Sequence, residues 1–390
     1  MNKKIIFFLA SFIFIYTSGF SECFMNYDSI LIELKILDNI YKLDTENLID
    51  IGDSWEKSIN KPGVDRDILL MSLGNNPNNR ILIICGQHAR EWLAVSSGLL
   101  AIKYFIEQYD EDDYVKYLMD NSEIMIVPLV NPDGYDWDIN NPLNQDTETR
   151  GGWRKNKHDN YPDDGEEFIP RYDGVDLNRN WPHEKWGENV DSFDEEDTYN
   201  NFDCSHRPFD LIYCGQENPE TGGPVVEPEI QSIINLFSLN NNIKAFLDIH
   251  TYTEIVGYPW GYTKESNMPD KNTYNFLSKM MAERINKKHN EKYRFGQTSF
   301  HPYMTTGSST DYVYDNENIL SFLYELRPEE DSNHYHFHIE EDNIIPAAEE
   351  TFEGIKTLIE WTLGPPYVKE VIITQDLDND GKFTDIIYDV

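Results

Sequence analysis

Residues 80–91, RILIICGQHARE, are the stretch that decides the fold. The first part, Arg80 to Gly86, consists mainly of short and β-branched apolar residues, the composition of a buried strand. The residues from Glu91 to Tyr109 then carry apolar side chains at the spacing of a helix. His88 and Glu91 therefore lie where a strand meets a helix, the usual location of chemistry in an α/β fold.

A histidine and a carboxylate three residues apart at such a bend can bind one zinc ion. A catalytic zinc also needs a third protein ligand and an open position for water. His250 is the candidate for the third ligand, because it ends a second apolar strand at 243–250. A His-x-x-Glu pair alone is a weak signal, and the two strand ends strengthen it.

Length and composition indicate a globular protein. The chain has 390 residues, enough for one large α/β domain or for two, with 39% hydrophobic and 13% aromatic residues. The formal net charge of −38 disfavours nucleic acid and anionic membrane surfaces as partners, and it would attract cationic ligands.

Strands and helices alternate along the chain. This pattern predicts an α/β fold with a mixed parallel and antiparallel sheet covered by helices on both faces. Strands 67–73 and 80–86 are expected to pair through the turn 74–79, and a second turn is expected at 131–134. The other predicted strands are 123–130, 243–250 and 318–326, and the predicted helices are 30–43, 91–109, 228–239, 272–289 and 346–363.

The first residues have the pattern of an export signal. Residues 1–21 combine a basic start, an apolar stretch and small residues at cleavage spacing, which predicts a signal peptide and no membrane anchor. We therefore expect a secreted protein, or a periplasmic one in a Gram-negative bacterium. Export permits a disulfide between Cys204 and Cys214, whereas Cys85 is expected to be a buried thiol and Cys23 to remain free.

Further charged residues stand in motifs elsewhere. Arg154 lies in Gly-Gly-Trp-Arg-Lys-Asn, and Asn178 and Arg179 lie in Gly-Val-Asp-Leu-Asn-Arg-Asn-Trp. Tyr303 precedes a Gly-Ser-Ser-Thr-Asp run, and Glu325 lies within an apolar strand. A carboxylate in such a strand is costly unless it is paired or functional.

Taken in order, these motifs resemble those of the pancreatic carboxypeptidase A/B family of zinc metallocarboxypeptidases. The likeness runs from about residue 30 to residue 363 through HxxE, NPDGY, WRK, GVDxNRNW, the His-x-Tyr after a strand, the tyrosine before GSSxD, and FxxELR. It implies a single α/β domain with a twisted mixed sheet at residues 30–364. Residues 365–390 lie outside the likeness, and we expect them to form a short C-terminal β extension.

The resemblance implies a role for each residue. His88, Glu91 and His250 would hold Zn²⁺, and Glu325 would act as the general base toward a zinc-bound water. Arg154 would stabilise the oxyanion. The substrate-binding residues would be Asn178 and Arg179, which clamp the terminal carboxylate, Tyr303, which closes over it, and Arg90 and Tyr252, which line the next subsite. Asp176 would accept a hydrogen bond from a ligating histidine.

The implied reaction releases single amino acids from peptides or proteins with a free C-terminus, and we expect a monomer. Thr310, which precedes the Asp of GSSxD, is neutral, so the first choice of substrate has a neutral or aromatic C-terminal residue. Gly257, Gly261 and Thr305 are expected to leave room in this pocket. Asp248 is an acidic group that could reach its floor, so mixed specificity that includes basic residues is the second choice.

The C-terminal tail carries a separate motif. Asp376, Asp378 and Asp380 have the D-x-D-x-D-G spacing of a Ca²⁺ loop, but Ile387 stands where an EF-hand has an acid. Calcium binding by a short loop between two strands is therefore one interpretation, and a polar β-turn is the other.

Three other functions remain open. An inactive peptidase-like binding protein would keep the clamp and lose catalytic groups, and a secreted calcium-dependent adhesion protein would rest on the tail alone. A zinc amidase acting on bacterial cell-wall peptides is a closer rival, against which the clamp and the WRK loop argue. Singly, Glu325 could be a structural acid and the arginines solvated loop cations. The run 333–338, with three histidines, has no assigned role.

Overall fold

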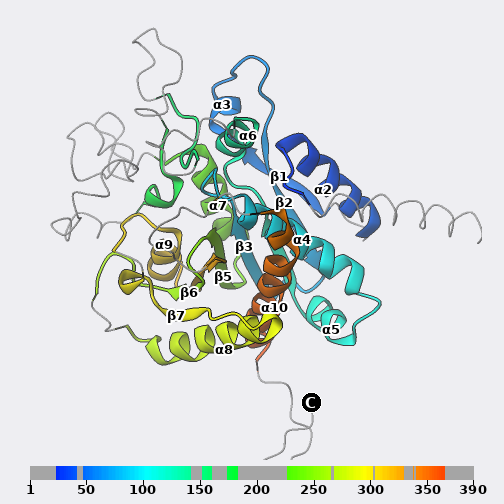
Figure 1. The fold of residues 1–390 in the computed structure, drawn as a ribbon, viewed down its shortest axis with the longest axis vertical. Coiled ribbons are helices and arrows are strands. Elements are labelled where there is room, and N and C mark those ends of the chain that lie inside the picture. Colours follow the sequence, from blue (N-terminus) through cyan, green and yellow to red (C-terminus); the bar gives the residue numbers. More distant parts are fainter. Residues whose placement is uncertain are drawn as a thin grey trace, which may run out of the picture.

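A mixed eight-stranded sheet forms the centre of the protein in the computed structural model (Figure 1). The structure describes residues 23–41, 47–141, 152–159, 174–182, 226–264, 268–301, 304–328, 337 and 340–364. Within these ranges the strands lie in the order β1 (Leu48–Asp53), β2 (Asp67–Gly74), β4 (Glu123–Val127), β3 (Arg80–Cys85), β5 (Ile243–Thr251), β8 (Leu320–Leu326), β6 (Ile255–Tyr258) and β7 (Arg294–Gln297).

The predicted pairing of β2 with β3 is wrong. Strand β4 lies between them, antiparallel to β2 and parallel to β3, with Ile126 opposite both Met71 and Ile83. Every residue from Ile81 to Cys85 is buried, as is every residue of β4 after its first. Two such apolar strands both need interior positions, so the short turn after β2 brings β3 near without making it a hydrogen-bonded neighbour.

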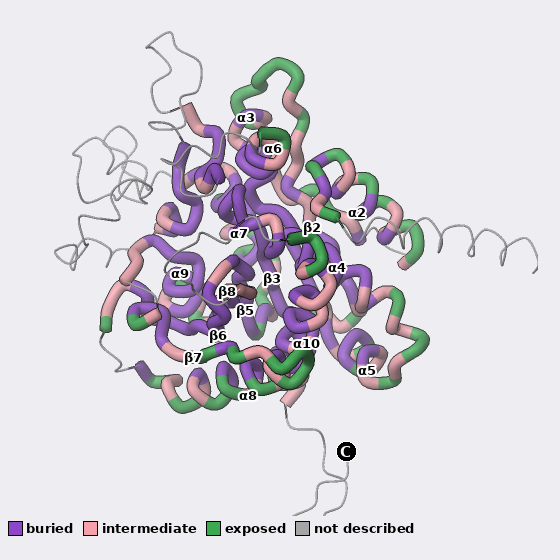
Figure 2. The backbone as a smooth tube through the Cα atoms, viewed as in Figure 1, coloured by how far each residue is buried: buried purple, intermediate pink, exposed green. Residues whose placement is uncertain are grey.

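Helices cover both faces of the sheet, as predicted. Along β3, Ile81, Ile83 and Cys85 belong to one apolar cluster and Leu82 and Ile84 to the other, because side chains alternate along a strand. The first cluster includes helices α2 (Tyr27–Tyr41), α4 (Trp92–Gln108), α5 (Asp113–Asn121), α8 (Lys271–His289) and α10 (Ile344–Thr362). The second includes α7 (Pro228–Leu239) and α9 (Ser309–Asn316). Figure 2 shows the buried strands between partly exposed helices.

Five further helices lie in the described ranges. They are α3 (Trp55–Ser58), α6 (Pro132–Asn140), η1 (Leu177–Arg179), η6 (Thr298–Phe300) and η7 (Glu341–Asn343). The turn expected at 131–134 is the start of α6, where the Asn131 side chain caps the helix by accepting a hydrogen bond from Gly134 N.

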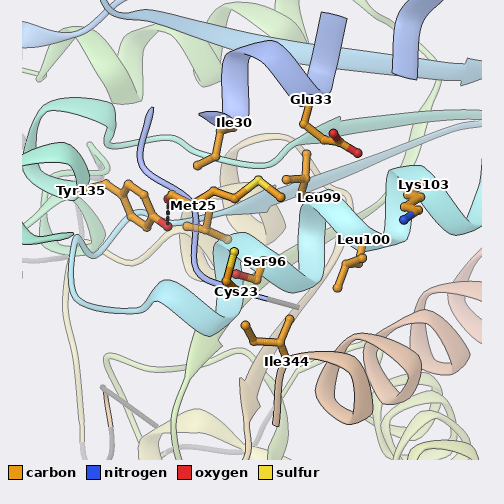
Figure 3. A pocket seen from close by; sticks show the side chains of 11 residues that line it. Cys23, Met25, Ile30, Glu33, Ser96, Leu99, Leu100, Lys103, Tyr135 and Ile344 are labelled. Carbon is orange, nitrogen blue, oxygen red and sulfur yellow. Dashed lines mark hydrogen bonds between the residues drawn. The ribbon is translucent and has the colours of Figure 1, made fainter. Parts of the chain in front are cut away.

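A narrow pocket separates α2 from α4 near the start of α10 (Figure 3). Met25, Ile30 and Leu99 give it an apolar lining, and Tyr135 Oη donates a hydrogen bond to Met25 O at 2.8 Å. Glu33 and Lys103 also line it, and burial raises the pKa of Glu33 against the opposing charge of Lys103. None of the predicted site residues lines this pocket, so it lies apart from the predicted metal ligands.

Several predictions concern residues outside the described ranges. These are the signal peptide, the Cys204–Cys214 disulfide, the C-terminal extension and the calcium loop at Asp376, Asp378 and Asp380. They stay predictions. Cys85 is a buried free thiol, as expected, and Cys23 is exposed. Across the part of the chain that the structure describes, every helix is too short or too polar to cross a membrane.

Candidate metal centre and active site

The carboxyl ends of three parallel strands bring the predicted site together. Cys85, the last residue of β3, pairs with Ile249 on β5, so His88 follows close to His250. On the other side of β5, His250 pairs with Glu325 on β8. Paired residues of neighbouring strands point to the same face. The sheet therefore places Glu325 beside a candidate metal ligand.

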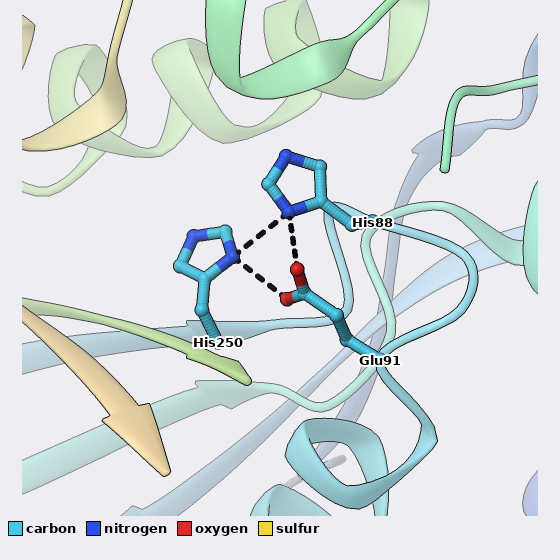
Figure 4. Close-up of side chains that lie close together, drawn as sticks. All are labelled: His88, Glu91 and His250. Carbon is cyan, nitrogen blue, oxygen red and sulfur yellow. Dashed lines mark hydrogen bonds and ion pairs between the residues drawn. The ribbon is translucent and has the colours of Figure 1, made fainter. Parts of the chain in front are cut away.

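His88, Glu91 and His250 form a compact buried group (Figure 4). Glu91 Oε1 lies 2.7 Å from His88 Nδ1, Glu91 Oε2 lies 2.9 Å from His250 Nδ1, and the two Nδ1 atoms are 3.1 Å apart. Zn–N bonds of about 2.0–2.1 Å in tetrahedral geometry separate neighbouring ligand atoms by roughly 3.3 Å. Two ring nitrogens and a carboxylate aimed at one point are therefore a donor set that suits zinc.

Glu91 is turned toward this group by its position. It is the N-cap residue of α4, yet its side chain makes no capping hydrogen bond. Its Oε2 atom faces His250 and also accepts a hydrogen bond from Thr251 N at 3.3 Å.

Each histidine has an acidic partner on its other ring nitrogen. Asp176 Oδ1 lies 3.1 Å from His88 Nε2, the contact expected for Asp176, and Asp248 Oδ2 lies 2.9 Å from His250 Nε2. Such a partner fixes the tautomer and leaves Nδ1 available to a metal. Asp248 is fully buried and also accepts hydrogen bonds from Gln87 Nε2 and the Ser309 hydroxyl. The expectation that Asp248 could reach the floor of a substrate pocket is therefore wrong.

The carboxylates set the charge of this group. Burial opposes charging of His250, but Asp248 and Glu91 outweigh it and raise the pKa of the imidazole well above its usual value. Burial would raise the pKa of Glu91, yet His88 and His250 lower it. Burial is likewise overcome at Asp176, whose pKa is held well below its usual value by Arg154 and His88. The surrounding acids thus stabilise positive charge at the point where the three candidate ligands meet.

Glu325 has a different environment. Part of its surface reaches solvent, but the surrounding protein removes most of the hydration of its carboxylate. This burial raises the pKa of Glu325 to about 8, with His250 opposing and Glu91 adding to the rise. A cation bound beside it would lower that pKa. The carboxyl is therefore able to exchange a proton near neutral pH.

Two arginines lie at the edge of the group. Arg154 Nε donates to Asp176 Oδ2 at 2.7 Å, and Arg154 Nη1 lies 4.0 Å from Glu91 Oε1. Asn178 Oδ1 accepts from Ser309 N at 2.9 Å, and Arg179 Nη1 donates to Asn178 O at 2.8 Å. The structure thus brings Arg154, Asn178 and Arg179 to the same site as the three candidate ligands.

Arg90 and Tyr252 meet at a residue without an assigned role in the sequence. The Arg90 guanidinium carbon lies 3.8 Å from the centre of the Phe337 ring, and the Tyr252 ring meets that ring edge-on with centroids 5.0 Å apart. Phe337, an aromatic residue within the histidine-rich run, is buried. Tyr303 is outside the described residues.

The glycines of the predicted specificity pocket permit close packing. A Cβ atom on Gly261 would lie 2.6 Å from Thr305 Oγ1, and one on Gly257 would lie 2.6 Å from Thr298 Cγ2. A side chain at either position would collide with these threonines, and the room expected in the pocket stays a prediction. Thr310 is buried at the start of α9, and its carbonyl accepts a hydrogen bond from the Ser321 hydroxyl at 2.7 Å.

Comparison with known proteins gives a consistent result. Residues 44–354 match the family model described as zinc carboxypeptidase. Mouse carboxypeptidase A4 is 30% identical over 314 residues, which cover 80% of this chain and 64% of the relative. Bovine carboxypeptidase A1 is 30% identical over 320 residues, which cover 82% of this chain and 65% of the relative. The chain thus spans slightly less than two thirds of the length of these curated relatives.

A solved structure shares the fold. Bovine thrombin-activatable fibrinolysis inhibitor, in complex with tick carboxypeptidase inhibitor, superposes with a TM-score of 0.66 at 24% identity. The match covers 88% of this chain and 99% of that chain.

Proposed function

Because the chain belongs to the zinc carboxypeptidase family, we propose that it is a zinc-dependent metallocarboxypeptidase that releases single amino acids from the free C-termini of peptides and proteins. The observation that carries the proposal is the buried His88–Glu91–His250 group with Glu325 on the adjacent strand. We further propose that residues 1–21 direct export and that the enzyme acts as a monomer.

His88, Glu91 and His250 would hold the metal. When bound, zinc would polarise the scissile carbonyl and make a neighbouring water more acidic. Asp176 and Asp248 keep the two imidazoles oriented for this role through the ring nitrogens that face away from the metal.

Glu325 would move the proton. A general base is most effective when its pKa lies near the working pH, because it must both take up and release the proton. Burial moves the pKa of Glu325 into this range. Its carboxylate would accept a proton from the attacking water and deliver that proton to the leaving amine.

The arginines would bind the two oxygen centres of the substrate. Arg154, held through Nε by Asp176, would direct its remaining nitrogens at the developing oxyanion. Arg179, with Asn178, would bind the terminal carboxylate, and Tyr303 would close over it. Arg90, Tyr252 and Phe337 would contact the preceding residue of the peptide.

We propose neutral C-terminal residues as the preferred substrates. Thr310 carries no charge, and the carboxylate of Asp248 is already bound to His250 and Ser309. We therefore place aromatic and other neutral residues first and mixed specificity that includes basic residues second.

A panel of blocked dipeptides with varied C-terminal residues tests the function. Each peptide is assayed as the free acid and as the amide, with a zinc chelator and after zinc is restored. Zinc-dependent release of the C-terminal residue from the acids, with little cleavage of the amides, supports the proposal. Equal cleavage of acids and amides, or cleavage confined to bacterial cell-wall peptides, would favour the amidase instead. Zinc binding without turnover would favour an inactive binding protein.

A further inference from the structure

The side chain of Asn156 lies at the junction of three chain segments outside the metal-binding group. It is fully buried and follows Arg154 by two residues in the segment 152–159. The second segment, 174–182, carries Arg179, and the third is the start of α7. Neither the metal chemistry nor the carboxylate clamp involves this asparagine directly.

The carboxamide of Asn156 uses its full hydrogen-bonding capacity. Its Oδ1 atom accepts from Val175 N at 2.8 Å and from His158 N at 3.2 Å. Its Nδ2 atom donates to Glu227 Oε2 at 2.7 Å and to Glu229 Oε2 at 3.4 Å. An amide has two donor hydrogens and an oxygen with two lone pairs, so both ends are satisfied.

Glu227 closes the connection from the other side. Its backbone N donates a hydrogen bond to Asn180 Oδ1 at 2.7 Å, and Asn180 is the residue directly after Arg179. The backbone N of Asn156 also donates a hydrogen bond to Val175 O at 3.0 Å. Val175 is the residue directly before Asp176, which accepts a hydrogen bond from Arg154. The segments bearing the two arginines are thus tied to one another and to the first turn of α7.

Helix α7 gives these contacts a rigid base. Ile230 and Ile233 lie in the apolar core, and Trp55 N donates to Glu229 Oε1 at 2.9 Å. Glu227 is almost fully buried, and both of its carboxylate oxygens also lie 2.9 Å from His158 Nδ1. Loss of a partner would leave a buried polar group unsatisfied, so this arrangement resists small displacements.

We propose that Asn156 is a positioning residue that, through Glu227, fixes the segment bearing Arg154 relative to the segment bearing Arg179. The inference rests on the proposed carboxypeptidase function. It predicts that one substitution at Asn156 disturbs both oxyanion stabilisation and carboxylate binding.

Asn156→Asp tests the proposal with almost no change in size. It replaces the Nδ2 donor of Asn156 by a carboxylate oxygen, which then faces the carboxylate of Glu227. The charged and titratable groups around that position are Glu227 and Glu229 at the start of α7, His158 in its own segment, and Asp133 near Glu229. Because carboxylates that share a site repel until one is protonated, the segments should separate at neutral pH. A misplacement near 1 Å can cost about 10²-fold in rate, so we expect kcat/KM to fall at least ~10-fold.

The kinetic signature separates positioning from simple destabilisation. Partial unfolding would lower the active fraction and therefore kcat, with KM unchanged. Displacement of both arginines should lower kcat and raise KM for the free-acid substrate. The ratio of variant to wild-type activity should rise as the pH falls, because protonation of the carboxylate pair restores a donor. Bound zinc should stay at the wild-type amount.

Glu227→Gln in the same chain supplies the rescue. The double variant exchanges amide and carboxylate across the same 2.7 Å contact, so a donor faces an acceptor again. We expect it to recover kcat/KM to within ~3-fold of wild type and to lose the abnormal pH dependence. Asn39→Asp, at an exposed position on α2, adds the same charge elsewhere and should leave activity unchanged. If Asn156→Asp does not fold, Asn156→Ala removes the same donor without adding charge and should also raise KM.

The outcomes separate the inference from the function. A wild-type protein that releases no C-terminal residue would contradict the proposed function. An active wild type with an equally active Asn156→Asp, or with a double variant no better than the single one, would overturn the positioning role alone.

Discussion

Gly307 lies against the backbone of Arg179, a residue of the proposed carboxylate clamp, and its replacement by alanine should impair that clamp. It has φ of +67°, and a Cβ atom added to it would lie 2.2 Å from Arg179 O and 2.5 Å from Arg179 C. Those contacts are with backbone, which cannot rotate away as a side chain can. Either the Gly307 loop or Arg179 must move by about 1 Å to restore ordinary contact.

The expected magnitude has two parts. The first is a loss of folding stability: left-handed backbone costs an alanine roughly 1–2 kcal/mol relative to the right-handed region, and the displacement of the backbone adds to this cost. A 1 Å shift at a site of this kind can reduce rate by about 10²-fold. We therefore expect Gly307→Ala to lower kcat/KM by roughly 10- to 100-fold on free-acid substrates. The ratio of kcat/KM for a free acid to kcat/KM for the matching amide should also fall.

Gly63→Ala is the matched control. Gly63 has φ of +82°, but nothing lies within 4 Å of an added Cβ atom. It should lose stability through backbone strain alone and keep full activity. Urea unfolding measures the stability of both variants, and kcat and KM on an acid and amide pair measure the clamp. If Gly307→Ala has the kinetics of Gly63→Ala, contact between Gly307 and Arg179 does not position the clamp.

Four further outcomes are expected. Glu325→Gln should abolish turnover with zinc retained, since an amide cannot accept the proton of the water; near-normal activity would exclude Glu325 as the base. His88→Ala should lose both metal and activity, and stoichiometric zinc by metal analysis would show that the ligand set is different. Arg154→Ala should chiefly lower kcat, by about 10² or more, whereas Arg179→Ala should chiefly raise KM for free acids; an unchanged acid-to-amide ratio in the latter would contradict the clamp. Burial raises the pKa of Asp311 to about 7, so the folded protein keeps a proton that the unfolded chain releases near pH 4. The free energy of unfolding should therefore fall as the pH rises from about 4 to 7, and Asp311→Asn should show less of this decline in urea titrations.

The elements with a complete apolar pattern could be predicted from the sequence. The helix expected at 228–239 is α7, and the helix expected at 91–109 is α4 with one residue fewer at each end. The strand expected at 243–250 is β5, which extends to Thr251. Apolar spacing determines which face of an element is buried, and this information lies within the element itself.

Strand neighbours and loop contacts depend on distant residues and could not be predicted in the same way. The turn after β2 indicates that β3 returns close by, but the equally apolar β4 occupies the position between them. The candidate ligands could be predicted because His88 follows the end of β3 and His250 lies at the end of β5, next to its final residue Thr251. Phe337 could not, because its contact with Arg90 and Tyr252 is made by a loop.

The distance along the chain between the two candidate histidine ligands has a consequence for biosynthesis. His88 and His250 are separated by 162 residues. At about 5–20 residues per second, a ribosome needs on the order of 10 s to make that span. During this interval the nascent chain offers only two of the three candidate ligands, His88 and Glu91, and such a pair holds zinc far more weakly than three ligands. Stable zinc loading should therefore wait until β5 has joined β3, so metal capture would report that the middle of the sheet has assembled.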